Sequence, residues 1–352
     1  MNQPLSELDL PTELVISIVI PVFNGGESFQ RCLASLAQFV STAVELIVID
    51  DGSTDGSGKL AQQMGAQVVR VPKSGGPARA RNLGAHIAQG DILFFVDADV
   101  TLKGDTVSQI ARIFRHQPGL AALIGSYDDA PGAPNFLSQY KNLFHHYTHQ
   151  TACEEASTFW GACGAIRRNV FLAIGGFDES YQKPCIEDIE LGYRLKRAGY
   201  SIRLCKDIQV KHLKCWKPLS LLRAEIFYRA LPWTELLLSN RQFNADLNLS
   251  HANRISVILV FALIGSLLAV GFMPWFLWVS IIITLGLLVM NWDVYRFFCT
   301  KRGLRFTLQV IPWHWLYFFY GGAAFAYGLL RHYLNRWYLP ELPMPLGVYK
   351  SK

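Results

Sequence analysis

The sequence predicts an α/β domain with a Rossmann-like, mostly parallel sheet, followed by an amphipathic interfacial region and C-terminal transmembrane helices. Two observations carry this prediction. Apolar, β-branched runs alternate with helix-forming segments over residues 15–96, which is the pattern of βα units joined by right-handed crossovers. Residues 255–290 contain no charged side chain, and this stretch exceeds the ~20 apolar residues that one membrane span needs.

Four buried strands are expected at Val15–Pro21, Val44–Ile49, Gln67–Val71 and Ile92–Val96. Turn and helix signals separate them; Pro77, for example, stands where the helix before the fourth strand begins. Sheets of this kind bind ligands beyond the carboxyl ends of their strands. Because acidic residues directly follow the second and fourth strands, the sequence predicts a polar site at this edge.

Composition narrows the class of protein. The net charge is +6 over 352 residues, but no basic run is interleaved with aromatic residues, so nucleic-acid binding is not expected. The seven cysteines form no CxxC pair and no Cys/His zinc spacing, which favours reduced thiols. Met1–Glu13 is acidic and lacks an apolar core, so it is not a signal peptide. We therefore expect the α/β domain on the cytoplasmic side of a cell membrane.

The C-terminal part predicts a multi-pass membrane region. Gly271–Pro274 divides the charge-free stretch into a hairpin of two transmembrane helices, and Leu308–Leu330 is a third apolar stretch. Basic residues between them, including Lys301 and Arg302, mark a cytoplasmic loop. Since Pro312 lies in the third stretch, that segment is either a span or re-entrant; we favour three spans.

These patterns divide the chain into an N-terminal tail (1–14), the α/β domain (15–215), an amphipathic interfacial region (216–252), a transmembrane region of about three spans (253–331) and a C-terminal tail (332–352). The interfacial region mixes leucines with Arg223, Arg229 and Arg241, as helices lying on a membrane do. A helix packed on the α/β domain is the alternative.

Asp97–Ala98–Asp99 is the centre of the predicted site. The strand before it delivers both carboxylates to the sheet edge. Hard cations such as Mg2+ or Mn2+ bind one or two carboxylates together with substrate phosphates, so Asp97 and Asp99 are candidate metal ligands. His212 is a further candidate ligand, and a structural histidine is the alternative reading.

Two upstream segments could hold a nucleotide. Asp50 and Asp51 follow the second strand; a carboxylate there can accept the imide N–H of a pyrimidine or bond a ribose, although helix capping is the alternative. The helix start at Gly75–Asn82 offers free backbone N–H groups to a diphosphate. Arg79 or Arg81 could pair with the same group.

Glu187–Asp188 opens a later helix. Backbone donors at a helix start can keep a partly buried carboxylate ionised, so Asp188 could act as a general base; N-capping is the alternative. Arg229 precedes the first apolar stretch and could reach donor phosphates. Trp233 would lie at the membrane interface or beneath an acceptor.

Together these segments resemble the family 2 glycosyltransferases, enzymes with a GT-A fold. The resemblance rests on five motifs between Val15 and His212, namely Ile18–Asn24, Val48–Asp55, Arg79–Gly84, Phe95–Asp99, and Gly175–Asp178 followed by Glu187–Leu191. It implies an inverting transferase that uses a nucleotide-sugar and Mg2+ or Mn2+. It also implies that Asp99 is the firmest metal ligand and that Asp188, with Glu187 beside it, is the catalytic base.

The expected donor-binding set follows the same motifs and comprises Pro21, Phe23, Asn24, Asp50, Asp51, Arg79, Arg81, Asp97, Arg229 and Trp233. The expected metal ligands are Asp97, Asp99 and His212. A UDP-sugar is favoured because a carboxylate suits uracil, and a GDP-sugar is possible.

One departure bears on the acceptor. Processive polysaccharide synthases of this family carry QxxRW after the catalytic carboxylate, whereas this chain has Arg229–Trp233 as RALPW. We therefore expect a single sugar to be added to a hydroxyl of a lipid or lipid-linked acceptor. A polyprenyl-phosphate sugar synthase and a non-catalytic membrane scaffold are the alternatives.

Overall fold

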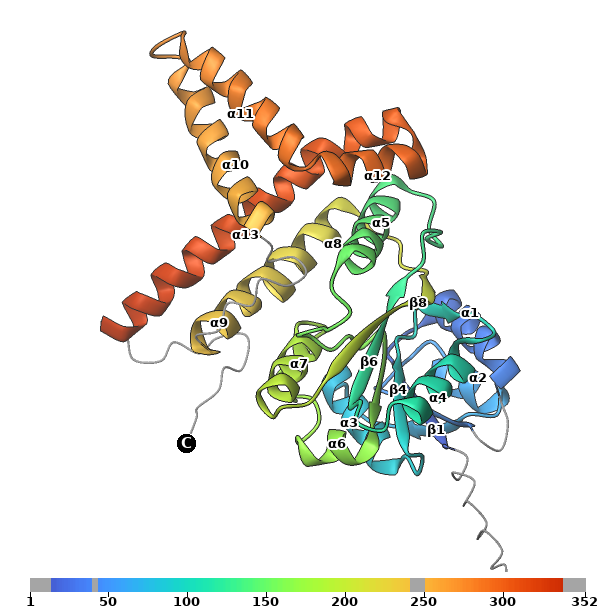
Figure 1. The fold of residues 1–352 in the computed structure, drawn as a ribbon. Helices are drawn as coiled ribbons and strands as arrows, with labels where there is room; N and C mark the ends of the chain where they lie inside the picture. Colours follow the sequence, from blue (N-terminus) through green and yellow to red (C-terminus); the bar gives the residue numbers. More distant parts are fainter. Residues whose placement is uncertain (1–13, 40–43, 241–250, 338–352) are drawn as a thin grey trace, which may run out of the picture.

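The computed structural model describes residues 14–39, 44–240 and 251–337, which form an α/β domain and a helical region (Figure 1). Most of the predicted N-terminal tail, the end of the interfacial region and the last fifteen residues (338–352) lie outside the described residues.

One eight-stranded sheet, in the order β3-β2-β1-β4-β7-β6-β8-β5, forms the centre of the α/β domain. Its strands are β1 Ile16–Val22, β2 Val44–Asp50, β3 Gln67–Arg70, β4 Ile92–Val96, β5 Val100–Leu102, β6 Ala122–Tyr127, β7 Cys163–Arg167 and β8 Ile202–His212. The four strands expected from the sequence are therefore present within two residues of their predicted bounds.

The sheet is mixed, which corrects the expectation of a mostly parallel one. β1, β2, β3 and β4 are mutually parallel, but β7 is antiparallel to both β4 and β6, and β5 is antiparallel to β8. The reason lies in the connections: after β4 the chain no longer alternates one strand with one crossover helix, so the parallel rule ceases to apply.

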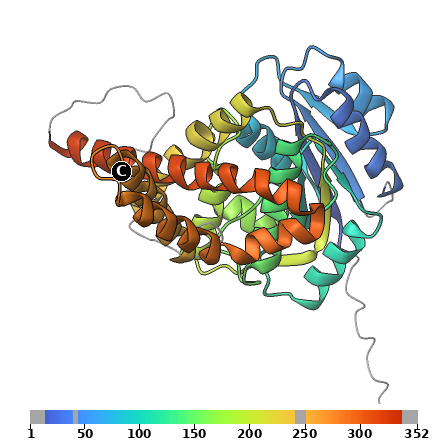
Figure 2. The same ribbon diagram turned by 90° about the horizontal axis from the view of Figure 1, so that it is seen from above.

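Helices cover both faces of the sheet (Figure 2). One apolar core lies under α1 Gly26–Leu36, α2 Ser57–Gln63 and α4 Thr106–His116. The other lies under α3 Pro77–Ile87, α6 Arg168–Ala173 and α7 Glu187–Arg197. Strand residues alternate between the two cores, so Val48 faces the first core while Ile47 and Ile49 face the second, as the period of a strand requires.

The helical region packs on the α/β domain through α5 Phe136–Thr151. It comprises α8 Pro218–Arg223, the π-helical η2 Ala224–Ala230, α9 Leu231–Asn240, α10 His251–Ala269, α11 Phe276–Met290, α12 Trp292–Arg302 and α13 Leu304–Trp337. The break predicted at Gly271–Pro274 separates α10 from α11, and this hairpin projects away from the α/β domain (Figure 1).

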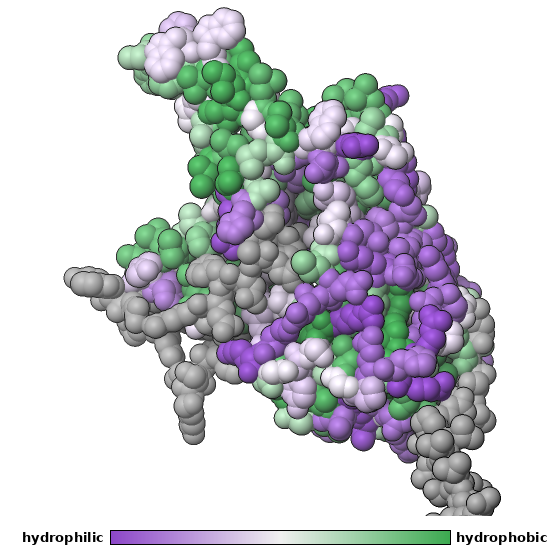
Figure 3. Space-filling model, viewed as in Figure 1, coloured by the Kyte–Doolittle hydropathy of each residue, from purple (hydrophilic) through white to green (hydrophobic). Residues whose placement is uncertain are grey.

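The helical hairpin α10–α11 carries the largest apolar surface visible in Figure 3. Its outward side chains include Ile258, Leu268, Ile282 and Val289, each at least 67% exposed. Polar contacts lie inside the hairpin, where Ser266 and Ser280 share a hydrogen bond of 2.8 Å. This inverted distribution is typical of helices in lipid, where the apolar surroundings favour an apolar exterior.

The predicted count of about three spans is not supported. Among the described residues one helix, α10, is long and apolar enough to cross a membrane, or two if the bent pair α11–α12 counts as one span. α11 has only 15 residues and meets α12 at a 65° bend. The third apolar stretch belongs to α13, a helix of 34 residues with Pro312 inside it, and polar residues dilute its hydropathy. The multi-pass topology therefore lacks support.

Candidate functional site

The predicted polar edge forms where β1, β2 and β4 end side by side. β1 and β2 are in parallel register with Val22 opposite Asp50, and the Asp51 N–H donates to the Val22 carbonyl at 2.8 Å. Pro21 is thus the last but one residue of β1, and Phe23 begins the turn beside Asp51. The two acidic segments of the sequence motif therefore meet the first turn at one edge.

Phe23 and Asn24 form a tight turn whose shape depends on one polar side chain. Asn24 has a φ of 51°, a left-handed conformation that asparagine tolerates better than most residues. Its Oδ1 accepts the Thr54 N–H at 2.8 Å, and its own N–H donates to Ser53 Oγ at 3.0 Å. The turn leaves the Phe23 side chain 57% exposed, with its ring free to stack on a planar ligand.

Asp50 and Asp51 point to opposite faces of the sheet. Asp51 accepts hydrogen bonds from Ser74 Oγ at 2.6 Å and from the N–H groups of Gly75 and Gly76 at 2.9 and 3.0 Å. It therefore holds the loop that begins α3. Asp50 accepts the Ser53 N–H at 2.8 Å and borders a cavity of about 410 Å3 lined also by Ser53, Thr54, Lys59 and Arg70.

Gly76, the last residue of this loop, packs closely against the backbone of Gln182. Its φ of +91° and the Gln182 carbonyl beside it leave no room for a Cβ atom, so glycine is required there. Arg79, one turn into α3, is exposed. It is the arginine of this helix whose side chain faces solvent at the site.

Arg81 has a different environment from Arg79. Its side chain is 5% exposed and bonds two carboxylates, Asp97 Oδ1 at 2.6 Å and Glu187 Oε1 at 2.9 Å. Although burial alone would lower the pKa of Arg81, these carboxylates hold it above its usual value. Arg81 therefore joins the end of β4 to the start of α7. Its predicted contact with a donor stays a prediction, because the guanidinium already has protein partners.

Asp99 and His212 form the metal side of the site. His212 Nε2 lies 3.5 Å from Asp99 Oδ2, and His212 Nδ1 lies 2.7 Å from the Asn142 side-chain oxygen. Because an amide oxygen only accepts, Nδ1 donates to Asn142, and Nε2 faces the Asp99 carboxylate. Burial opposes ionisation of Asp99, but the facing His212 outweighs it and lowers the pKa of Asp99 to about 2.

These two side chains fit part of a divalent cation site, because a carboxylate oxygen and an imidazole nitrogen are both ligands of Mn2+ or Mg2+. Asp97 instead turns toward Arg81. Within the described parts of the chain, no group of three His, Cys, Asp or Glu side chains is placed to hold a metal ion. Any further ligands would have to come from substrate oxygens, as is usual for Mg2+ bound with phosphates.

Asp188 is placed as a candidate base. Its Oδ2 accepts the Gly161 N–H at 3.1 Å. Burial and the neighbouring Glu187 raise the pKa of Asp188 to about 6, while Arg81 and Arg229 act in the opposite direction. A carboxylate with this pKa is ionised near neutrality and still basic enough to take a proton.

Glu187 is the other predicted catalytic residue, and both of its carboxylate oxygens have protein partners. Oε1 bonds Arg81, and Oε2 accepts the Cys185 N–H at 2.8 Å. Its side chain is 5% exposed. The geometry gives Glu187 a supporting position beneath Asp188, and its direct participation stays a prediction.

Arg229 and Trp233 reach the site from the helical region. Arg229 is 46% exposed on its side chain and lies 3.4 Å from Glu225. The Trp233 indole N–H donates to Tyr193 Oη at 3.0 Å, so it docks α9 onto α7, the helix that carries Asp188. Trp233 thus lies against the helix that carries the base, and the contact of either residue with a donor stays a prediction.

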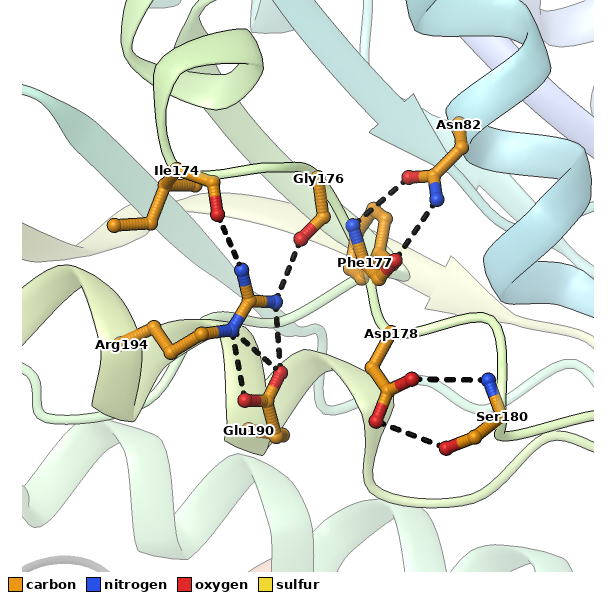
Figure 4. A network of polar contacts seen from close by, with 8 residues as sticks. All are labelled: Asn82, Ile174, Gly176, Phe177, Asp178, Ser180, Glu190 and Arg194. Carbon is orange, nitrogen blue, oxygen red and sulfur yellow. Dashed lines mark hydrogen bonds and ion pairs between the residues drawn. The ribbon is translucent and has the colours of Figure 1, made fainter. Parts of the chain in front are cut away.

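A polar network behind α7 fixes the Gly175–Asp178 motif (Figure 4). Arg194 donates to the carbonyls of Ile174 and Gly176 at 2.7 and 2.6 Å while pairing with Glu190. From the other side, Asn82 exchanges two hydrogen bonds with the backbone of Phe177. The network thus binds α3, the motif and α7 into one rigid unit.

Several supporting residues had no clear sequence signal. Asn142, which orients His212, and Lys141 lie in α5, outside the motifs that predicted the site. Glu225 could have been found from its spacing of four residues to Arg229. His146 and His149 of α5 are buried and contact the carbonyls of Tyr127 and Gly125.

Comparison with known proteins agrees with this arrangement. Residues 17–175 match the family described as glycosyl transferase family 2. Glycosyltransferase GlyG of Streptococcus pneumoniae is 28% identical over 146 residues, which is 40% of this chain and 46% of that protein. The 4,4'-diaponeurosporenoate glycosyltransferase of Staphylococcus haemolyticus is 40% identical over 96 residues, or 26% of this chain and 25% of that protein. The chain thus spans less than half the length of these relatives.

Among solved structures, TarS 1-349 of S. aureus in complex with UDP-GlcNAc has a TM-score of 0.50 and 20% identity, covering 69% of this chain and 70% of that one. At this identity the likeness concerns the fold, which is GT-A-like. Together with the family match, it accounts for the motifs at the polar edge. Residues 17–175, a little under half of the chain, are thus similar to the glycosyl transferase family 2 proteins.

Proposed function

We propose that this protein is an inverting glycosyltransferase that moves one sugar from a nucleotide-diphosphate sugar to a hydroxyl of a lipid or lipid-linked acceptor at the cytoplasmic face of a cell membrane. The observation that carries the proposal is the bridge made by Arg81. Its two ion pairs, to Asp97 at 2.6 Å and to Glu187 at 2.9 Å, connect the metal side to the residue preceding Asp188. The phosphate end of a donor and the base for an acceptor then share one site.

In this proposal the nucleotide lies along the ends of β1 and β2. Phe23, flanked by Pro21 and Asn24, offers a ring for stacking on the base. Either Asp50 or Asp51, which point to opposite faces of the sheet, offers a carboxylate acceptor for its N–H groups or for ribose hydroxyls. The exposed Arg79 at the start of α3 supplies a cation for the diphosphate. A UDP-sugar is favoured over a GDP-sugar.

Asp99 and His212 would hold Mg2+ or Mn2+, and Asp97 lies beside them. The cation would neutralise charge that develops on the departing nucleoside diphosphate. His212 lowers the pKa of the partly buried Asp99 carboxylate, so Asp99 would bind the cation without first losing a proton. Asn142 orients the imidazole, which is the usual way to fix a ligating histidine.

Asp188 would act on the acceptor. It accepts the proton of the acceptor hydroxyl as that oxygen forms a bond to the anomeric carbon. The bond from this carbon to the diphosphate oxygen breaks on the opposite face, and the nucleoside diphosphate leaves with the electron pair. The transition state is expected to resemble an oxocarbenium ion, as in glycoside hydrolysis.

The helical hairpin α10–α11 supports a membrane location and hence an apolar acceptor. Its exposed leucine and isoleucine side chains form a surface that water would not accommodate over such an area. Trp233, whose indole contacts Tyr193 of the helix that carries Asp188, and Arg229 would meet an acceptor that approaches from the membrane.

Binding of nucleotide-sugars to the full chain in detergent or vesicles tests the proposal. A thermal-shift panel of UDP- and GDP-sugars with Mn2+ or Mg2+ should give one donor that raises Tm in a concentration-dependent way. Transfer to lipid acceptors should follow with that donor alone. No stabilisation and no turnover with any donor would support a non-catalytic scaffold. Turnover that survives Asp188→Asn would support a polyprenyl-phosphate acceptor, which needs no base.

A further inference from the structure

Tyr127, the last residue of β6, contacts the metal side of the site but belongs to none of the sequence motifs. Its ring stacks on the imidazole of His212, with the two ring centres 4.4 Å apart and an angle of 6° between the planes. Trp160 meets the Tyr127 ring edge to face, at 4.8 Å and 83°. Aromatic rings prefer stacked and edge-to-face pairs of this kind. Tyr127 therefore packs His212 and Trp160 into one aromatic cluster.

The pairing of β6 with β8 brings Tyr127 and His212 together. The two strands are parallel neighbours, and Tyr127 lies opposite Val210. His212 comes two residues after Val210, so it lies on the same face of the sheet as Tyr127. At the same place the Leu213 N–H donates to the Asp99 carbonyl at 2.8 Å. The backbone thus brings Tyr127, His212 and Asp99 to one corner of the sheet.

Two contacts fix the orientation of the His212 imidazole. Its Nδ1 donates to the Asn142 side-chain oxygen at 2.7 Å, which fixes one point of the ring and leaves Nε2 as the nitrogen that can bind a cation. A single hydrogen bond does not fix the tilt of the ring plane. The parallel ring of Tyr127 restrains that tilt, because two flat rings in contact cannot turn independently. Nε2 is then held facing Asp99 Oδ2, at 3.5 Å.

The protein also holds Tyr127 in place. Its carbonyl oxygen accepts a hydrogen bond from Nδ1 of the buried His146 at 2.7 Å. The edge-to-face contact with Trp160 restrains the Tyr127 ring itself. The surface on which His212 stacks is therefore fixed from both the backbone and the side chain, as a residue that orients a metal ligand needs to be.

We propose that Tyr127 is a positioning residue for the metal side: its ring, supported by Trp160, holds the His212 imidazole in the plane in which Nε2 and Asp99 can bind one divalent cation. This inference rests on the proposed function, in which Asp99 and His212 hold Mg2+ or Mn2+. A Tyr127 that served only to pack β6 against the apolar core would contribute to stability and leave metal binding unchanged.

Tyr127→Leu and Tyr127→Phe in the full chain test the proposal by direct binding of Mn2+. Mn2+ is titrated against each protein in detergent with a fixed concentration of UDP, and free Mn2+ is measured by its electron paramagnetic resonance signal. We expect the Mn2+ concentration for half-saturation to rise up to about tenfold in Tyr127→Leu, as for other residues that orient metal ligands. Tyr127→Phe keeps the ring and should bind Mn2+ like the wild type.

Tyr147→Leu is the matched control. Tyr147 of α5 also contacts an aromatic ring, that of Phe297 in α12 at 5.2 Å, so this variant loses a comparable aromatic contact between other elements. It should leave the Mn2+ concentration for half-saturation unchanged. The Tm of every variant without metal shows whether it is folded. If Tyr127→Leu is not, Tyr127→Met takes its place, with the same expected rise.

A double-mutant cycle with His212→Gln provides the second measurement. If Tyr127 acts through His212, Tyr127→Leu should add little to the loss of Mn2+ affinity already caused by His212→Gln. Additive losses, or wild-type affinity in the folded leucine or methionine variant, would overturn the proposal. An equal loss in Tyr127→Phe would also overturn it, since the hydroxyl and not the ring would then matter. Absence of Mn2+ binding by the wild type would contradict the metal site of the proposed function, and this inference with it.

Discussion

The α/β domain and the helical region place their charged and apolar side chains in opposite ways. In the α/β domain, two apolar cores lie beneath the helices, and charged groups gather at one sheet edge, where Arg81 lies between two carboxylates. In the helical hairpin α10–α11, the apolar side chains face outward and the polar ones face inward. The α/β domain therefore keeps its apolar side chains inside, whereas the hairpin exposes them.

Because of this difference, we expect the turnover of the protein and its location in the cell to depend on different regions. Changes at the polar edge should alter turnover, metal use or folding of the α/β domain. Changes on the outer face of the hairpin should alter where the protein resides and leave the site intact. A change of turnover from the outer face of the hairpin, or a change of location from the polar edge, would contradict this division.

The largest expected effect is on turnover in Asp188→Asn. Loss of a general base costs about 10²–10⁴ in kcat, whereas donor binding depends on the other side of the site. We therefore expect transfer to a hydroxyl acceptor to fall by at least two orders of magnitude with the donor-induced rise in Tm retained. Radiolabelled transfer and thermal shift on the same preparation measure both quantities.

The pH dependence of stability is an independent test of the same residue. The pKa of Asp188 is raised from 3.8 to about 6, so the folded state holds this proton more tightly than the unfolded chain. Asp188 therefore makes the wild type less stable as the pH rises from about 4 to about 6. Asp188→Asn should consequently have a higher Tm than wild type above pH 6. An equal or lower Tm throughout would contradict the burial assigned to this carboxylate.

The next largest effect is on stability in Arg81→Met. The substitution leaves Glu187, at 5% exposure, as an unpaired buried carboxylate, while Asp97, at 33%, can still reach water. Removing one partner of a buried pair costs about 3–5 kcal/mol, and we expect the lower part of this range because Asp97 is partly hydrated. Chemical denaturation of the α/β domain measures it. Arg79→Met is the control, since Arg79 is exposed on the same helix, and it should leave the unfolding midpoint unchanged.

How much of this could be read from the sequence depends on the range of the contacts. The strands before Asp51 and Asp97 were predictable because β-branched runs and terminal acids are local signals. The antiparallel position of β7 between β4 and β6 could not be predicted, since tertiary packing decides which strands pair. The partners of Arg81 likewise lie in distant segments, so the sequence suggested a donor diphosphate as its partner and gave no sign of Asp97 or Glu187.

The helical region illustrates the same limit. The break at Gly271–Pro274 followed from turn-forming residues, but the apolar stretch at 308–330 gave no sign that it continues into a single helix of 34 residues. Apolar composition predicts that a segment avoids water; it does not say whether the segment crosses a bilayer, lies along it or packs on a neighbour. Lys141 and Glu225 are each ordinary surface-type residues in sequence, and only the fold brings them together.

A smaller effect is expected from His212→Gln. Glutamine keeps a similar size but lacks the imidazole nitrogen that faces Asp99 at 3.5 Å. The concentration of Mn2+ needed for half-maximal donor stabilisation should rise about tenfold or more. His116→Gln on the exposed face of α4 should leave it unchanged. A metal requirement equal to wild type in His212→Gln would remove His212 from the metal side of the site.

The smallest effect on chemistry is expected from Leu268→Lys, the change that tests the other region. Leu268 is 71% exposed near the end of α10; a lysine costs about 2.5–3.5 kcal/mol at the centre of a membrane helix and less toward its ends. The variant should shift from the membrane fraction to the soluble fraction while its donor-induced rise in Tm stays unchanged. Leu263→Lys supplies the contrast: Leu263 is 7% exposed inside the hairpin, so that variant should lose folded protein instead. If Leu268→Lys left the membrane fraction unchanged, the outer face of α10 would not be a lipid contact, and the apolar exterior would need a protein partner to explain it.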